Sequence, residues 1–359
     1  MLYRKELEKI NSYKPGKPIE EVKRSLGLEE VYKLASNEIP FAPYYLRKVI
    51  NNELKNINRY PESNCFYLRK KISKRLGVEQ DQIVFGNGSD ELITLSLRAI
   101  INKNDEVIVA YPTFLIYEIQ AKIQNAKVVR VPLTNFRYDL NKISEKVTKN
   151  TKIIFIANPD NPTGTYLNNN EIREFLEKIP EEVLVFFDEA YFEFAPSNFP
   201  QTLKFMKTRG NIIVARTFSK VYGLAGLRIG YGITTKETAE FLNKVREPFN
   251  INRFAQVAAV AALENDSFIK KVLRYISKEK AYLYKELKRC NLFFIESATN
   301  FILVDFKKPV LPLFNFLLKQ GIIIRNLDSW GLDNCFRVTV GLHRENKKFI
   351  AYLRSYLNK

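Results

Sequence analysis

The chain has 359 residues, 46% of them hydrophobic and 27% charged, which is typical of a soluble globular protein large enough for two domains. Three cysteines without a CxxC pair and a single histidine, His343, argue against a disulfide framework and against a bound metal. The net charge of +18 would suit a nucleic-acid-binding protein. The lysines are scattered along amphipathic patterns, however, as expected of solvated helix faces in a protein without a nucleic-acid partner.

Membrane and export segments are not expected. The apolar runs are strand-sized, far short of the roughly 20 residues that cross a bilayer. The first eight residues, MLYRKELE, are charged from the start and lack the apolar core of a signal peptide. We therefore expect a cytoplasmic protein without a membrane partner.

The first two thirds of the chain alternate short β-branched runs with helical patterns, which predicts a parallel sheet with crossover helices. Because these runs are continuously apolar, we expect the strands to be buried on both faces. The six predicted strands cover residues 82–85, 106–110, 127–131, 152–156, 183–187 and 211–215.

Beyond about residue 246 the pattern changes. A long helical pattern over 254–288 is followed by three strand-like runs and a closing helix from Glu345, which predicts a smaller α+β domain. The three runs cover 301–304, 322–324 and 336–340. We predict a large domain over 35–246 and a small domain over 247–359, with residues 1–34 packing on the latter.

Each polar motif of the large domain directly follows one of the apolar runs. Ligands of open α/β sheets bind at the carboxyl ends of the strands, so these motifs should meet in one crevice. The first, Gly86–Ile93, opens a helix and suits a phosphate, although a plain glycine turn with a polar cap would look the same. Phe114, after the next run, could stack on a ligand ring or simply pack in the core.

Three further motifs carry the chemistry. The dense turn Asn158–Gly164, with two prolines and a glycine, presents Asn161 as a hydrogen-bond donor. Asp188 ends an apolar run, where a buried carboxylate needs a partner, and Tyr191 follows it by one short turn. Lys220 ends Arg216-Thr217-Phe218-Ser219-Lys220, where a partly desolvated site would depress the pKa of its amine. Taken singly, Asp188 could be a helix cap and Lys220 a surface lysine.

Together, a lysine, an aspartate, a tyrosine and an asparagine at strand ends are the groups that hold pyridoxal 5'-phosphate (PLP). As an ordered set the motifs resemble the PLP-dependent aminotransferases of fold type I, class I/II, and among them most closely those that act on histidinol phosphate. The resemblance implies an α/β fold with a large, mostly parallel sheet covered by helices on both faces, plus a smaller α+β domain. The matching stretches are 35–38, 59–61, 86–92, 158–164, 188–191, 216–228, 248–252, 299–303 and 337–341.

The resemblance also implies a role for each matching residue. Lys220 would be the catalytic residue and would attach the cofactor covalently. Asp188 would pair with the pyridine nitrogen, Asn161 and Tyr191 would hold the phenolic oxygen, and Phe114 would stack on the ring. The remaining cofactor contacts, around the phosphate, are expected at Ser89, Asp90, Glu91, Thr217, Ser219 and Arg228.

Further implied contacts concern the partner subunit and the substrate. Tyr60 would reach the cofactor phosphate of the neighbouring subunit, which makes a homodimer the functional unit. Arg337 would grip the carboxylate of the amino donor, with Arg325 as a second anion contact and Asn37 beside them. The sequence departs from the family pattern at Ile39, where an asparagine is usual; this loop borders the substrate pocket, so the departure concerns the substrate and not the cofactor.

The implied reaction converts L-histidinol phosphate and 2-oxoglutarate to imidazole-acetol phosphate and L-glutamate, reversibly, in histidine biosynthesis. Two alternatives on the same scaffold stay open: an aromatic amino-acid aminotransferase and a threonine-phosphate decarboxylase. A remote alternative from another class is a nucleic-acid-binding regulator, which would usually need an added helix-turn-helix segment.

Overall fold

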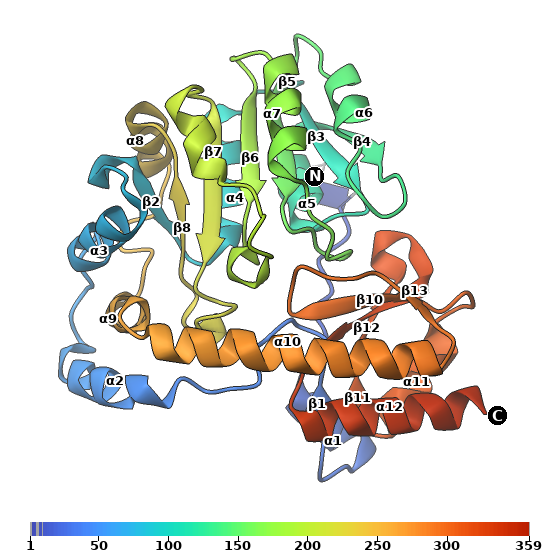
Figure 1. Cartoon of the computed structure of the whole chain (residues 1–359). Helices are drawn as coiled ribbons and strands as arrows, with labels where there is room; N and C mark the ends of the chain where they lie inside the picture. The colour runs from blue at the N-terminus through green and yellow to red at the C-terminus, as the bar shows by residue number, and fades with distance from the viewer. Residues whose placement is uncertain (1, 5–6, 9, 359) are drawn as a thin grey trace.

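A seven-stranded sheet dominates the upper part of the molecule in Figure 1. The computed structural model describes residues 2–4, 7–8 and 10–358. The strand order of the large sheet is β2-β8-β7-β6-β5-β3-β4, and every neighbouring pair is parallel except the two that involve β8. The strands are β2 (Ile83–Gly86), β3 (Glu106–Tyr111), β4 (Lys127–Pro132), β5 (Thr151–Ala157), β6 (Leu184–Asp188), β7 (Ile212–Thr217) and β8 (Gly230–Ile233).

All six predicted strands form, but the sheet differs from the prediction in two respects. Strand β8 was not predicted, because two of its four residues, Gly230 and Gly232, lack side chains and leave no apolar run. Strand β4 was expected to be buried on both faces, yet several of its residues are exposed. Among the described strands it pairs with β3 alone and forms the edge of the sheet, so water reaches it from the open side.

Helices cover the large sheet on both faces. On one face lie α4 (Ser89–Ile100), α5 (Ile116–Ile123) and α8 (Lys236–Lys244), and on the other lie α6 (Leu140–Glu145) and α7 (Asn169–Lys178). Each face buries its own apolar cluster, and Phe155 and Phe186 of the first cluster are fully buried. Burial of one such ring contributes about 1.5–3 kcal/mol, so the two clusters supply much of the driving force for folding.

The second, smaller sheet is antiparallel and carries helices on one side. Its order is β12 (Arg325–Leu327), β13 (Leu332–Thr339), β10 (Phe301–Asp305) and β9 (Phe293–Phe294). The helices are α10 (Asp266–Arg289), α11 (Leu311–Lys319) and α12 (His343–Leu357), and their apolar faces share one core with this sheet. In Figure 1, α10 crosses the lower half of the molecule horizontally, from below the large sheet to the small one.

The single helix predicted over 254–288 is wrong in one respect. It is two helices, α9 (Arg253–Leu263) and α10. The break falls at Asn265, whose side-chain oxygen accepts a hydrogen bond from Phe268 N (3.0 Å) and so starts a new helix. A capping residue inside an apolar helical pattern overrides the periodicity here.

The first 80 residues contribute to both ends of the molecule. Helix α1 (Ile19–Leu26) precedes β1 (Tyr32–Lys33), which pairs in parallel with β11 (Ile322–Ile323). Helices α2 (Arg47–Glu53) and α3 (Phe66–Leu76) pack on α9. The boundaries predicted at 34/35 and 246/247 stay a prediction. Within the described ranges, every helix is too short or too polar to cross a membrane.

Candidate active site

A pocket of about 370 Å³ lies at the carboxyl ends of β5, β6 and β7, beside the first turn of α4. Strands β12 and β13 of the small sheet complete its wall through Arg325 and Arg337. All but two of the residues predicted for cofactor or substrate line this one pocket. They are Asn37, Ser89, Asp90, Phe114, Asn161, Asp188, Tyr191, Thr217, Ser219, Lys220, Arg228, Arg325 and Arg337.

Asp188, the last residue of β6, is held at the floor of the pocket. Its carboxylate accepts hydrogen bonds from Ala190 N (3.1 Å) and from Tyr117 Oη (2.7 Å). Burial raises the pKa of Asp188 to about 6, because the ionised form loses its hydration. Tyr117 was missed by the sequence analysis. It lies on α5, three residues after Phe114, and nothing in the sequence distinguishes it from a core aromatic residue.

Lys220 lies on the loop that leaves β7 and lines the pocket. Its Nζ lies 5.4 Å from the centre of the Tyr191 ring. Burial, reinforced by the positive charge of Arg337, lowers the pKa of Lys220 to about 8. The amine is therefore neutral far more often than a surface lysine, which is what a nucleophilic or basic amine requires.

The loop that carries Lys220 is closed at both ends by the sheet. Strands β7 and β8 are antiparallel neighbours, and their last paired residues are Thr217 and Gly230. Phe218 N donates to Ile229 O (3.0 Å), and Leu224 N donates back to Phe218 O (3.0 Å). The base of the loop thus belongs to the sheet rather than to a mobile surface segment.

Arg337 connects the small sheet to the pocket. Its guanidinium donates to Asn161 Oδ1 and to Ala35 O (2.8 Å), and burial lowers its pKa to about 10. The Nε atoms of Arg337 and Arg325 are buried and have no hydrogen-bond partner in the part of the chain that the structure describes. Among the described residues, no carboxylate forms an ion pair with either arginine, so both keep donors for an anionic ligand.

The opposite end of the pocket carries groups that suit a phosphate. Helix α4 begins after Gly88, which provides no side-chain cap for the free N–H groups of the first turn. Arg228 Nη1 donates to Ser219 Oγ (3.3 Å), and Arg228 Nη2 lies 3.4 Å from Asp90 Oδ2. Gly88 has φ +78°, which strains any other residue, and a Cβ atom there would lie 2.4 Å from Arg228 Nη2 and displace this guanidinium.

Asn37 and Tyr191 meet at the phenol of the tyrosine, where Asn37 Nδ2 donates to Tyr191 Oη (2.7 Å).

Two residues that were predicted to contact the cofactor lie outside this pocket. The Glu91 carboxylate turns away from the pocket and accepts from Asn87 N (2.5 Å) and Asn250 Nδ2 (2.6 Å). It braces the turn before α4 and does not contact the pocket.

Tyr60 is the second predicted residue outside the pocket of its own chain. Its side chain is 80% exposed and stacks on Phe249, with ring centres 4.8 Å apart.

Tyr13, which was not predicted, lines the pocket beside Arg325 and Arg337. The Pro- and Gly-containing stretch that follows it, Lys14 to Pro18, indicates an extended segment but not its destination.

The groups in the pocket fit PLP, which carries a phosphate, a phenolic oxygen and a ring nitrogen. Asp188 has no ion-pair partner among the described residues and suits the ring nitrogen, the Lys220 amine of depressed pKa suits the covalent attachment, and the uncapped start of α4 beside Arg228 suits the phosphate. The residues that the structure describes contain no cluster of His, Cys, Asp and Glu arranged to hold a metal ion. Fold and pocket thus define a PLP-dependent enzyme of fold type I.

Comparison with known proteins gives the family. The model of the family described as "Aminotransferase class I and II" matches residues 29–353, and the chain belongs to this family. It is 43% identical to "Histidinol-phosphate aminotransferase 2" of Carboxydothermus hydrogenoformans, over 99% of both chains. It is 42% identical to "Histidinol-phosphate aminotransferase" of Moorella thermoacetica, over 97% of this chain and 91% of that one. The histidinol-phosphate aminotransferase of Sinorhizobium meliloti, solved in complex with pyridoxal-5'-phosphate, superposes with a TM-score of 0.92 at 27% identity, over 99% of this chain and 98% of that one.

Proposed function

We propose that the protein is a histidinol-phosphate transaminase. It exchanges an amino group between L-glutamate and imidazole-acetol phosphate, giving 2-oxoglutarate and L-histidinol phosphate, and it runs reversibly in histidine biosynthesis in the cytoplasm. The observation that carries the proposal is the similarity along the whole chain to relatives whose names state this activity. An aminotransferase pocket with two arginines at its substrate side agrees with it.

The substrate side must accept two kinds of anion in turn. Glutamate and 2-oxoglutarate are dicarboxylates, whereas histidinol phosphate is a phosphate ester. A guanidinium group binds either anion through two parallel hydrogen bonds, so Arg337 and Arg325 suit both substrates. The unpartnered Nε atoms of these two residues supply donors for that purpose.

The cofactor would be held by residues from several strand ends. Asp188 would pair with the ring nitrogen, Asn161 and Tyr191 would contact the phenolic oxygen, and Phe114 would lie on the ring. Bound PLP supplies an electron sink that makes the α-proton of an amino acid acidic. Lys220 Nζ would attach the cofactor at rest and, once freed, would take the proton from the α-carbon of the donor. The phosphate would lie among Ser89, Asp90, Thr217, Ser219 and Arg228.

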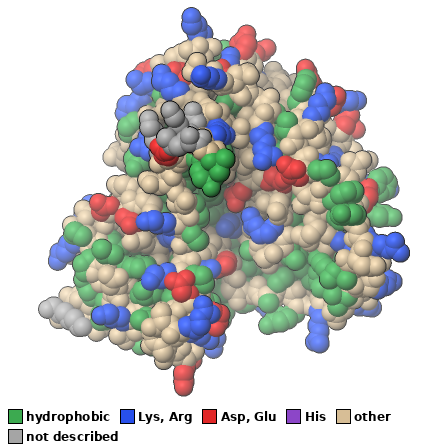
Figure 2. Space-filling model, turned by 180° about the vertical axis from the view of Figure 1, so that it is seen from behind, with side chains coloured by type: hydrophobic (Ala, Val, Ile, Leu, Met, Phe, Trp, Pro, Cys, Tyr) green, Lys and Arg blue, Asp and Glu red, His purple; other side chains and the backbone are tan. Residues whose placement is uncertain are grey.

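A homodimer belongs to the proposal because Tyr60 points away from the pocket of its own chain. Exposed aromatic and aliphatic side chains lie on the segment after α2, on α3 and on the segment after α8, and a second copy would cover them. Figure 2 shows hydrophobic side chains gathered at lower right, on the side where α2 and α3 lie, while Lys and Arg are interspersed with Asp and Glu elsewhere on this face. The exposed residues are Leu54, Ile57, Tyr60, Phe66, Tyr67 and Phe249.

The test is a substrate panel on the purified protein loaded with PLP. Histidinol phosphate, phenylalanine, tyrosine and threonine phosphate are each supplied with 2-oxoglutarate, and glutamate and carbon dioxide are measured. We expect glutamate to form fastest with histidinol phosphate. Preference for phenylalanine or tyrosine would replace the proposal by an aromatic aminotransferase, and carbon dioxide release from threonine phosphate without 2-oxoglutarate would replace it by a decarboxylase.

A second test addresses the lysine. Lys220→Ala should abolish turnover and the covalent PLP adduct that borohydride traps in the wild type. Lys280→Ala is the matched control, because burial also lowers the pKa of Lys280 to about 8 but this residue lies outside the pocket. A trapped adduct in Lys220→Ala, or its loss in Lys280→Ala, would contradict the assignment of the catalytic residue.

A further inference from the structure

We propose that Thr113, Asp160 and Tyr138 act as a positioning node that sets the spacing between Phe114 and Asn161 across the cofactor site. None of the three lines the pocket. Each is nevertheless buried directly behind it, and two of them precede a pocket residue in the chain. The inference rests on the cofactor contacts proposed above for Phe114 and Asn161.

The node is a chain of short hydrogen bonds between two strand ends. Thr113 Oγ1, after β3, donates to Asp160 Oδ1, after β5 (2.7 Å). The same Thr113 hydroxyl lies 2.7 Å from Tyr138 Oη, and Tyr138 Oη accepts from Ala157 N (3.1 Å) at the end of β5. The loops after β3 and β5 are therefore joined through side chains at the level where they reach the pocket.

Asp160 is an unusual residue to find there. It is 1% exposed, and its partners are hydroxyl and amide groups, with no ion pair among the described residues. Burial raises its pKa to about 6. A buried carboxylate without a cation is costly, so a plain loop would be more stable with an uncharged residue at this position. The cost has a purpose if the carboxylate fixes the conformation of the turn that presents Asn161 to the pocket.

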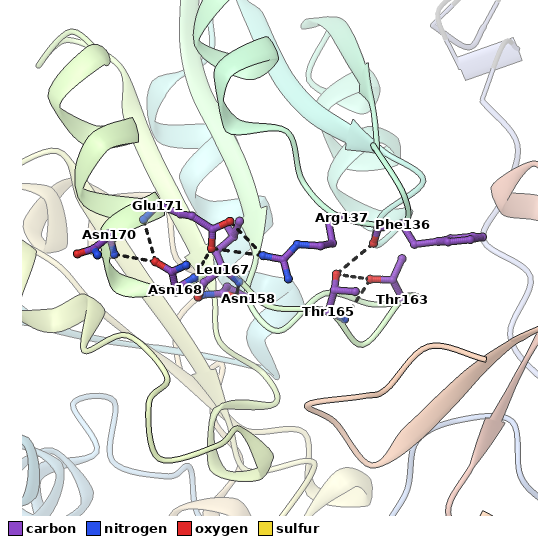
Figure 3. Close-up of polar contacts among 9 residues, drawn as sticks. All are labelled: Phe136, Arg137, Asn158, Thr163, Thr165, Leu167, Asn168, Asn170 and Glu171. Atoms are coloured by element: carbon purple, nitrogen blue, oxygen red, sulfur yellow. Dashed lines mark hydrogen bonds and ion pairs between the residues drawn. The ribbon is translucent and has the colours of Figure 1, made fainter. Parts of the chain in front are cut away.

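The outer side of the same turn is also braced. Asp160 Oδ2 accepts from Thr163 Oγ1 (2.8 Å), which lies 2.8 Å from Thr165 Oγ1, and Thr165 Oγ1 donates to Phe136 O (3.1 Å). Figure 3 shows this contact of Thr163, Thr165 and Phe136 at one end of the turn, and Asn158 with Leu167 at its base. The turn that presents Asn161 is thus held from both sides.

The node also reaches the small sheet. Trp330 Nε1, in the short helical turn after β12, donates to Thr113 O (2.8 Å). The guanidinium of Arg325 lies over the Trp330 ring, with its Cζ atom 4.9 Å from the ring centre. Thr113 is therefore linked to three residues with proposed ligand contacts: to Phe114 through the chain, to Asn161 through Asp160, and to Arg325 through Trp330.

The experiment compares Thr113→Val, which keeps the shape but removes the hydroxyl, with Thr113→Ser, which restores it. Thr234→Val is the matched control, because Thr234 is equally buried and its hydroxyl donates to Ile212 O (2.8 Å) outside the pocket. Three quantities are measured: the dissociation constant of PLP by fluorescence, the pH dependence of the absorbance of bound PLP, and Tm of the cofactor-free protein.

We expect Thr113→Val to weaken PLP binding about tenfold, which corresponds to the loss of about one hydrogen bond between Asn161 and the cofactor when the turn carrying Asn161 shifts, and to change the pH at which bound PLP changes colour. Thr113→Ser should recover most of both. Thr234→Val should lower Tm by a similar amount while leaving PLP binding and absorbance unchanged. Tyr138→Phe keeps the bond between Thr113 and Asp160 and should give a smaller effect, and it serves if Thr113→Val does not fold.

A loss of Tm in Thr113→Val with PLP binding and absorbance like those of the control would overturn the proposal and leave a purely structural role. The measurements use no amino-acid substrate, so a wrong assignment of histidinol phosphate would not affect them. Failure of the wild type to bind PLP would instead refute the proposed function itself.

Discussion

The depressed pKa of Lys220 predicts that the active-site lysine destabilises the cofactor-free protein. Its pKa falls from the usual 10.5 to about 8. Each unit corresponds to about 1.4 kcal/mol, so the charged amine costs the folded state about 3 kcal/mol. Between pH 8 and 10.5 the folded chain holds fewer protons on this group than the unfolded chain, so the free energy of unfolding rises with pH over this window. Below pH 8 the full cost is present.

Lys220→Met removes the charge and keeps the volume. We expect the cofactor-free variant to be about 3 kcal/mol more stable than the wild type at pH 7, with the difference vanishing near pH 10.5. Urea unfolding followed by circular dichroism at several pH values, at one protein concentration, measures it. Lys280→Met should gain less, because it also loses the hydrogen bond from Lys280 Nζ to Ser297 O (2.5 Å). A pH-independent difference, or a variant less stable than the wild type at pH 7, would refute the reasoning.

Three further outcomes are expected. Gly230→Ala would place a Cβ atom 2.6 Å from the backbone N of Ser89 and should lower the free energy of unfolding by about 3 kcal/mol, as measured by thermal unfolding. Gly27→Ala, with φ +65° and open space around it, should lower it by only about 1 kcal/mol. Equal losses in the two variants would contradict the packing argument. Arg337→Met should raise KM for glutamate about 100-fold, as for two charge-assisted hydrogen bonds, and an unchanged KM would exclude the residue from substrate binding. Asp188→Asn should nearly abolish turnover but should stabilise the cofactor-free protein above pH 6 and not below pH 4. The pKa of Asp188 is raised to about 6, so the cost of its charge to the folded state appears only as pH rises through that range. Urea unfolding midpoints at pH 4 and pH 8 test the sign of this change in stability.

The large sheet could be predicted from the sequence because most of its strands are uninterrupted apolar runs that end at a motif. The rule that ligands bind at the carboxyl ends of such strands also predicts that Asp188, Asn161 and Lys220 lie close together, and all three line one pocket. The functional roles of these residues stay predictions, whereas their proximity is a property of the structure.

What escaped prediction has physical causes. Strand β8 has glycines where a pattern would need side chains. Tyr117 contacts Asp188 from a helix interior, and a buried aromatic residue at helical spacing is indistinguishable from core packing. Glu91 shares the first turn of α4 with Ser89 and Asp90, but the helix turns its carboxylate to the opposite side, toward Asn250. Direction of a side chain around a helix depends on tertiary neighbours that a linear pattern does not contain.

The pairing of β7 with β8 fixes the position of Lys220 independently of the small sheet. Lys220 lies on a loop whose two ends are paired within the large sheet, while Arg325 and Arg337 belong to the small sheet. With the proposed roles, a movement of the small sheet would change the contacts of the two arginines with a bound acid and leave the lysine amine in place. One substrate would then be exchanged for the next without displacing that amine.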